Sequence, residues 1–150
     1  MKNIPLLTII LGLTLFLSGQ PALAQTPEAP VRQTVIDFFQ AMADLDFPKM
    51  RSYCQPDFQL LEHGELWTLD VLEDKLKPNV GTGMQRTNVF EFIKVTVKGK
   101  TAWVSYHNSA QIVRQGQERN VHWLESAVLE KTRQGWKIAL LHSTVKPVKK

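Results

Sequence analysis

The stretch from residue 88 to residue 146 most constrains the fold, because it contains four long runs of β-compatible residues joined by short polar turns. The runs cover residues 88–98, 101–114, 119–132 and 136–146. Strands joined by such short turns pair in antiparallel fashion, whereas parallel strands need a long crossover connection. No helical pattern separates the runs, so we expect a meander of antiparallel strands rather than a parallel sheet.

The residues before this meander carry the pattern of helices. Between residues 31 and 45, apolar residues recur at spacings of three and four, which places them on one helix face: they are Val31, Val35, Phe38, Phe39, Met42 and Leu45. Pro48 ends this helix, since the residue before a proline is disfavoured in the α region. We expect a short second helix over 49–54, a hairpin over 58–67 and a third helix over 71–77. The whole is an α+β fold with the helices on one sheet face.

The first residues have the three parts of a secretory signal. A basic start at Lys2 precedes an apolar core, and small residues at Ala22 and Ala24 fit the site that signal peptidase cuts. Polar residues and a proline interrupt the apolar run too early for a membrane-spanning helix, which needs about 20 apolar residues. We therefore expect residues 1–24 to be removed and no stable membrane anchor to remain. The protein should then be periplasmic or secreted, beginning near Gln25.

The remainder of the chain fits one domain. We expect a flexible lead at residues 25–30, a single domain at residues 31–146 and a basic tail at residues 147–150. The formal net charge of +4 is spread along the chain, which argues against nucleic-acid binding, because that function concentrates basic residues on one face. The single cysteine, Cys54, cannot form an internal disulfide, so stability must come from the core.

The last two runs form a predicted hairpin whose register decides which polar side chains meet. If residues 133–134 form a two-residue loop, Glu125 lies opposite His142. If residues 133–135 form a three-residue loop, the register moves by one and Ser126 lies opposite His142. We prefer the first alignment because it groups apolar residues of both strands on one face: Trp123, Ala127, Leu129, Ile138 and Leu140.

In the preferred register a carboxylate and an imidazole stand side by side in a cavity wall. Glu125 would orient His142 and raise its basicity, which makes an acid-base pair. Tyr106 or Asn108 on the neighbouring strand would donate a hydrogen bond, so the candidate catalytic residues are His142, Glu125 and Tyr106. In the alternative interpretation the pair has only a structural role, and Glu125 and His142 form hydrogen bonds with each other and with a nearby hydroxyl group. The candidate ligand-binding residues are Phe39, Met42, Trp67, Tyr106, Asn108, Trp123, Glu125 and His142.

Histidines in the predicted strands raise the question of a metal site, since three imidazoles suit zinc. The residues concerned are His107, His122 and His142. They come from three different strands and have no local spacing signature, and strand alternation does not by itself place all three on one face. We therefore expect no metal and no cofactor.

The order of helices, hairpin, helix and four strands, together with Trp136-Lys137-Ile138 and His142-Ser143 in the last strand, resembles the NTF2-like superfamily. The likeness covers residues 31–146 and is strongest to the SnoaL-like and DUF4440-like bacterial members. It implies a cone-shaped fold, in which a strongly bent, mainly antiparallel sheet wraps around the N-terminal helices and leaves a pocket between sheet and helices. It also implies a homodimer through the outer sheet face, which fits the apolar residues on both sides of the strand 101–114.

This scaffold serves many functions, so the resemblance leaves the role open. Its ketosteroid-isomerase-like members use an Asp base on the sheet, and this chain has no Asp after residue 88. We therefore expect a binding domain for a small apolar or carbonyl- or hydroxyl-bearing molecule rather than an enzyme. Two alternatives stay open: an isomerase, dehydratase or cyclase that uses the His-Glu pair, and a protein-interaction subunit that docks a partner through the outer sheet face.

Overall fold

The computed structural model describes residues 26–147. The predicted signal segment, residues 1–24, lies outside the described residues, as do the first residue of the predicted lead and the end of the predicted tail. The elements follow in the order α1 (Ala29–Ala43), α2 (Phe47–Ser52), β1 (Cys54–Glu62), β2 (Glu65–Trp67), α3 (Leu69–Leu76), the 3₁₀ helix η1 (Lys77–Asn79), β3 (Gln85–Lys98), β4 (Thr101–Arg114), β5 (Gln117–Thr132) and β6 (Gly135–Val145). Within these residues, no helix has the length and apolar character that a membrane span requires.

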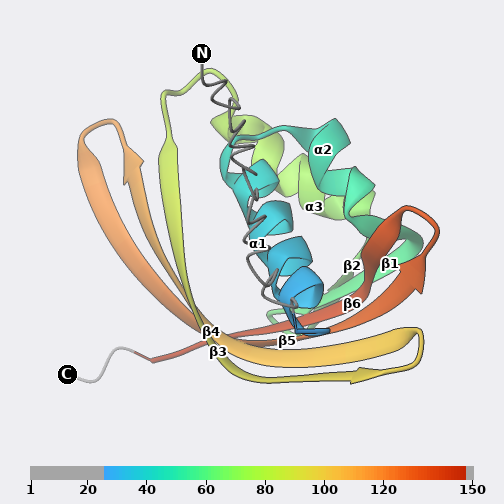
Figure 1. Ribbon diagram of the computed structural model, residues 1–150. Helices are drawn as coiled ribbons and strands as arrows, with labels where there is room; N and C mark the ends of the chain where they lie inside the picture. The colour runs from blue at the N-terminus through green and yellow to red at the C-terminus, as the bar shows by residue number, and fades with distance from the viewer. Residues whose placement is uncertain (1–25, 148–150) are drawn as a thin grey trace, which may run out of the picture.

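The strands form one six-stranded mixed sheet in the order β2-β1-β6-β5-β4-β3. Strands β3 to β6 make the predicted antiparallel meander, and β1 joins its far edge parallel to β6. Helix α1 lies along the concave side of the curled sheet, and α2 and α3 lie near one end of it (Figure 1). The α+β fold is therefore confirmed, with one parallel pair in an otherwise antiparallel sheet.

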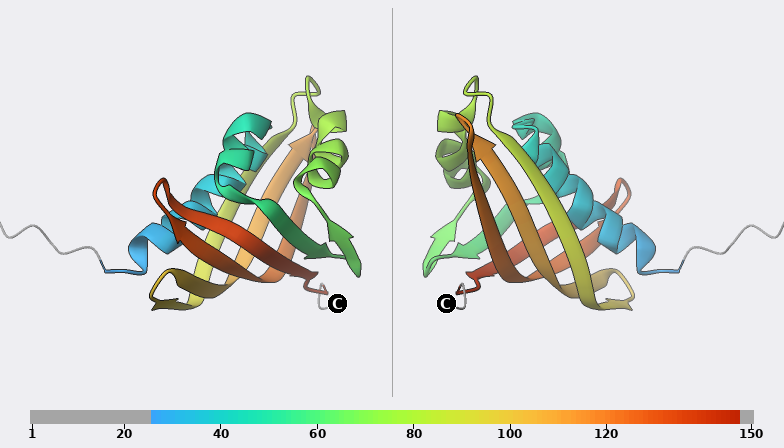
Figure 2. Two further views of the ribbon diagram at one scale, coloured as in Figure 1. Left: turned by 90° about the vertical axis from the view of Figure 1, so that its right-hand side faces the viewer. Right: turned by 90° about the vertical axis from the view of Figure 1, so that its left-hand side faces the viewer.

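Two β-bulges in the antiparallel meander accompany the strong bend of the sheet. The register between β3 and β4 shifts at Ile93, and the register between β5 and β6 shifts at Ala139. A bulge adds a residue to one strand only, which bends that strand and increases its twist. The long strands therefore curve around α1 instead of lying flat, as both views of Figure 2 show.

Helix α1 supplies the centre of the core. Pro30 lies in its first turn, where the missing N–H of a proline costs nothing. The predicted apolar face is buried: Val31, Val35, Phe38, Phe39 and Met42. The helix ends at Ala43, before the predicted end, because Leu45 takes the left-handed conformation with a φ of 56°. Asp46 then caps α2 by accepting a hydrogen bond from the Lys49 backbone N–H at 3.0 Å.

Strand β1 begins earlier than the sequence pattern predicts. The expected helix 49–54 ends at Ser52, and Cys54 opens β1 beside β6. Burial raises the pKa of the Cys54 thiol, so this side chain stays protonated and packs in the core. The predicted hairpin tip is confirmed, since His63 and Gly64 turn the chain with positive φ values of 52° and 77°, the conformation that tight two-residue turns require.

Candidate functional site

Glu125 is a buried ionisable group near the centre of the sheet. Strand alternation turns its side chain toward the helices, and the residue is 4% exposed. Asn108 in β4 donates a hydrogen bond from Nδ2 to Glu125 Oε2 at 3.1 Å. Ser143 in β6 donates one from Oγ to Glu125 Oε1 at 3.0 Å. Both donors are themselves buried, so three neighbouring strands hold the carboxyl group in one orientation.

A line of polar groups continues from Asn108 to the start of β3. Asn88 Nδ2 donates to Asn108 Oδ1 at 2.8 Å, and Arg86 Nε donates to Asn88 Oδ1 at 3.0 Å. The Arg86 guanidinium also lies 5.4 Å from the centroid of the Trp123 ring, and its Nη1 contacts the Met42 sulfur at 3.5 Å. Strands β3, β4 and β5 thus share one polar line that ends at the buried carboxyl group.

Tyr106 lies opposite Glu125 across β4 and β5. Its ring is fully buried and packs near Phe39, Phe90 and Phe92, with ring centroids 6.4, 5.9 and 5.6 Å away. Its hydroxyl makes no hydrogen bond of ordinary geometry with any described residue. Burial, and then the charge of Glu125, raises the pKa of Tyr106 well above its usual value. Tyr106 therefore keeps its O–H as a hydrogen-bond donor beside the carboxyl group.

Burial also determines the acidity of Glu125. The loss of water around the carboxylate raises the pKa of Glu125 to about 7, although the Asn108 and Ser143 hydrogen bonds, and then the nearby Tyr106 hydroxyl and Arg86 charge, oppose the shift. Near neutral pH both protonation states are therefore present. A carboxyl group in this condition can give or take a proton and can donate or accept a hydrogen bond.

Glu125 forms part of the wall of a cavity of about 270 Å³ between the sheet and the helices. The rest of the wall is mostly apolar and comes from α1, α3 and the strands. The cavity brings together five of the predicted ligand-binding residues: Phe39, Met42, Trp67, Trp123 and Glu125. Tyr106 and Asn108 lie next to Glu125 but do not line the cavity. An apolar cavity with a few convergent polar groups is the usual form of a small-molecule site.

His142 does not meet Glu125. The hairpin has the predicted two-residue loop, but the bulge at Ala139 moves the rest of β6 by one residue. Ser126 therefore faces His142, and Glu125 faces Ser143. The preferred register is wrong beyond the bulge, and His142 is exposed on the outer side of the sheet. A bulge interrupts the two-residue alternation without changing the loop, so loop length alone does not determine the register.

Sequence reasoning missed two arginines that line the cavity, Arg86 in β3 and Arg119 in β5. Both also line an adjoining hollow of about 460 Å³. The predicted strand starts at residue 88, whereas β3 starts at Gln85. The prediction therefore placed Arg86 in the loop before the strand. The two-residue alternation of side chains, extended backward from Phe90, identifies Arg86, because it places both residues on the same side of the strand.

The three histidines of the strands lie on the outer side of the sheet. In each strand the residues before and after the histidine are buried or partly buried on the inner side, so the histidine points outward: His107, His122 and His142. His122 Nδ1 lies 2.8 Å from Ser109 Oγ. His107 Nδ1 is buried and has no hydrogen-bond partner among residues 26–147. In that same part of the chain, no three His, Cys, Asp or Glu side chains are grouped as a metal site needs.

Solved structures share this fold at low sequence identity. An NTF2-like protein from Cytophaga hutchinsonii is 13% identical with a TM-score of 0.68, and the match covers 81% of this chain and 100% of that one. A ketosteroid isomerase-like protein from Erwinia carotovora is 18% identical with a TM-score of 0.66, covering 83% and 100%. A CaMKII hub from S. rosetta is 20% identical with a TM-score of 0.68, covering 81% and 98%. These likenesses show the fold alone.

The sequence itself identifies the family. No curated protein matches the chain, but the family model described as a SnoaL-like domain matches residues 31–146. That range contains both the helices and the sheet that form the cavity. Because the match spans most of the chain, the protein belongs to the SnoaL-like domain family, within the NTF2-like superfamily.

Proposed function

We propose that the protein is an exported binding domain that holds a small organic molecule in the cavity beside Glu125. The observation that carries this proposal is a buried carboxyl group, oriented by two hydrogen bonds, in the wall of a mostly apolar cavity. With a pKa of about 7, Glu125 can donate a hydrogen bond to a carbonyl oxygen or accept one from a hydroxyl group. The signal pattern of residues 1–24 supports export.

Native mass spectrometry of the chain from its exported fraction tests this function. We expect a chain that begins near Gln25 and carries a discrete extra mass, which denaturation releases. Glu125→Gln keeps the size of the side chain but removes its charge and its acidic proton. The affinity for the bound molecule should fall about tenfold, the effect of losing one hydrogen bond to a charged group, and the fraction of chains that carry the extra mass should fall with it.

The matched control is Glu91→Gln, because Glu91 is exposed in β3 on the side away from the helices. The fraction of chains that carry the extra mass should be the same in this variant as in the wild type. A wild-type chain that releases no mass on denaturation contradicts the binding function. A chain that retains residues 1–24 contradicts export without affecting the cavity.

The pKa near 7 also favours a second function, proton transfer within the bound molecule. Ionised Glu125 would take a proton from a carbon atom next to a carbonyl group, and the resulting carboxylic acid would return it to another carbon of the same molecule. No other reactant is consumed, so the reaction is an isomerisation. Turnover should rise as the pH rises through about 7 and be lost in Glu125→Gln. A ligand that the wild type releases unchanged contradicts this function.

A second copy of the chain is the partner that we propose for the outer side of the sheet. Val89, Trp103 and Leu124 are 65%, 44% and 46% exposed on this side, and none of the described helices covers it (Figure 2). A sheet normally buries its large apolar side chains against another layer, so three such side chains exposed on one side favour a second layer there. Docking of a different protein would use the same surface.

A further inference from the structure

Arg86 is a partly buried cation that reaches the cavity without an ion pair. Its polar contacts are Asn88 Oδ1 at 3.0 Å and the Met42 sulfur at 3.5 Å, and its guanidinium lies over the Trp123 ring. Within residues 26–147, none of the salt bridges includes Arg86. A guanidinium has five N–H donors, so several of them remain for another acceptor.

Burying this cation is unfavourable unless a negative charge compensates it. The loss of water lowers the pKa of Arg86, and the more distant charges of Glu125 and Glu62 oppose that shift. Neither of these carboxyl groups forms an ion pair with Arg86 within residues 26–147, so no direct contact with a negative charge offsets the cost of burying the guanidinium.

Arg119 adds a second positive charge to the same region. It lies opposite Ile112 across β4 and β5 and lines both the cavity and the adjoining hollow, as Arg86 does. Arg114 lines the hollow as well. The region where the cavity meets the hollow is therefore basic, whereas the interior of the cavity is mostly apolar.

We propose that the molecule bound in the cavity is a small organic carboxylic acid, with its carboxylate on Arg86 and its apolar part in the interior. This inference rests on the proposed binding function and names its ligand class. A planar guanidinium matches a carboxylate through two parallel hydrogen bonds, and Arg119 adds attraction from the hollow. Phe39, Leu72 and Trp67 line the apolar interior. A volume of about 270 Å³ limits the apolar part to a single ring or a short chain.

Isothermal titration calorimetry with matched acids and amides tests the ligand class. The probes are phenylacetate and hexanoate, each compared with its neutral amide of nearly the same shape. At about pH 6 the probe acids are ionised, whereas most of Glu125 is protonated. We expect the better-fitting carboxylate to bind the wild type about tenfold more tightly than its amide, since a charge-assisted pair is roughly twice as strong as a neutral hydrogen bond.

Three variants assign the effect to Arg86. Arg86→Gln should lower the carboxylate affinity about tenfold and leave the amide affinity unchanged. Arg86→Lys keeps the positive charge and should retain more carboxylate affinity than Arg86→Gln, which separates loss of charge from a folding defect. Arg133→Gln, in the exposed turn before β6, is the matched control and should change neither affinity.

The possible outcomes distinguish the ligand class from the binding function. Amides that bind as tightly as the acids overturn the carboxylic-acid proposal and leave small-molecule binding in place. If neither acids nor amides bind, the carboxylic-acid proposal is overturned, and the mass released from the exported chain decides the binding function separately. An equal loss of acid and amide affinity in Arg86→Gln and Arg86→Lys overturns the role of Arg86 as the carboxylate contact.

Discussion

At the scale of single residues, the site depends on a carboxyl group whose protonation is determined by its surroundings. Asn108 and Ser143 give Glu125 two hydrogen bonds from neutral donors. These donors replace only part of the water around an exposed carboxylate, so the pKa of Glu125 rises instead of falling. Glu125 thus combines a fixed orientation with a proton that it gains or loses near pH 7, which suits both hydrogen bonding and proton transfer.

This shift predicts that the stability of the protein depends on pH. The pKa of Glu125 is about 7 in the folded chain and has its ordinary value of 4.5 in the unfolded chain. Between these values the folded state binds more protons, so the free energy of unfolding falls as the pH rises from 4.5 to about 7. The loss amounts to about 3 kcal/mol. Urea unfolding at about pH 5 and about pH 8 measures it.

Glu125→Gln should lose this part of the pH dependence, because an amide binds no proton in this range. Asp44→Asn controls for the removal of an exposed carboxylate, because Asp44 lies at the end of α1 and outside the sheet, and this variant should behave like the wild type. The same change of unfolding free energy with pH in wild type and Glu125→Gln would show that burial does not perturb this carboxyl group.

Strand alternation predicted some site residues, and local irregularities displaced others. Trp123 and Glu125 face the helices because successive side chains of a strand alternate between its two sides. Arg86 was missed because the predicted strand began at residue 88, whereas β3 begins at Gln85, so the alternation was not extended back to it. His142 was placed on the wrong side because the extra residue at Ala139 interrupts the alternation of β6.

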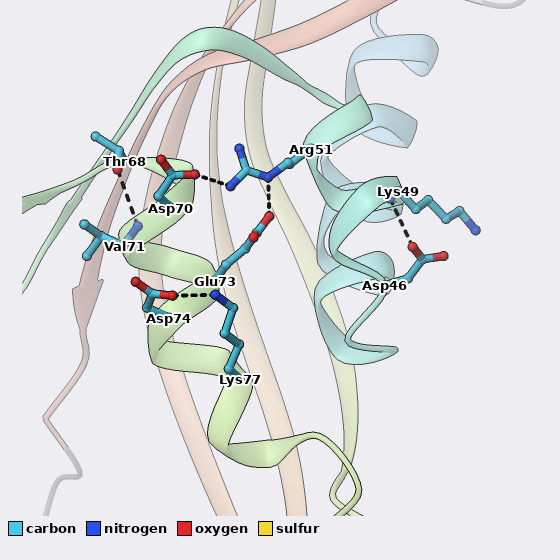
Figure 3. Close-up of polar contacts among 9 residues, drawn as sticks. All are labelled: Asp46, Lys49, Arg51, Thr68, Asp70, Val71, Glu73, Asp74 and Lys77. Atoms are coloured by element: carbon cyan, nitrogen blue, oxygen red, sulfur yellow. Dashed lines mark hydrogen bonds and ion pairs between the residues drawn. The ribbon is translucent and has the colours of Figure 1, made fainter.

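At the scale of elements, α3 helps to enclose the cavity and is linked to α2 by Arg51. The Arg51 side chain extends from α2 toward α3 and pairs with Asp70 and Glu73 (Figure 3). On another side of α3, Leu72 and Leu76 line the cavity. These ion pairs therefore hold in place a helix that shapes the candidate ligand site.

Arg51→Met should destabilise the protein by about 1 kcal/mol, because it removes two ion pairs that are partly exposed and hence weak. Lys49→Met is the matched control on the same helix, since the Lys49 side chain points away from α3 (Figure 3). Its free energy of unfolding should stay within about 0.5 kcal/mol of the wild-type value. Urea unfolding gives both values, and equal values for the two variants would exclude a stabilising role for the Arg51 pairs.

At the scale of the whole molecule, the two sides of the sheet have different surroundings. The inner side packs against the helices and contains the cavity, whereas no described helix covers the outer side (Figures 1 and 2). A dimer through the outer side would therefore leave the cavity open to a ligand. The proposed binding function and the proposed dimer use separate surfaces and can be tested separately.

Trp103→Lys should weaken the homodimer at least about tenfold, because it places a charge where a large aromatic side chain would be buried. Val71→Lys, on the exposed side of α3, is the control and should leave the dimer intact. Sedimentation equilibrium of the purified chain measures both. A monomeric wild type contradicts the dimer, and a dimer that tolerates Trp103→Lys places the interface elsewhere.

The sequence by itself determined the type and order of the elements, because apolar spacing, prolines and short polar turns act on neighbouring residues. The helix face from Val31 to Met42 and the strand meander from β3 to β6 follow from such local patterns. Only the tertiary structure decided the parallel pairing of β1 with β6, the bulge at Ala139 and the place of Arg86 in the cavity wall. The pKa of Glu125 belongs to this second group. These features depend on contacts between residues far apart in the chain, which no local pattern specifies.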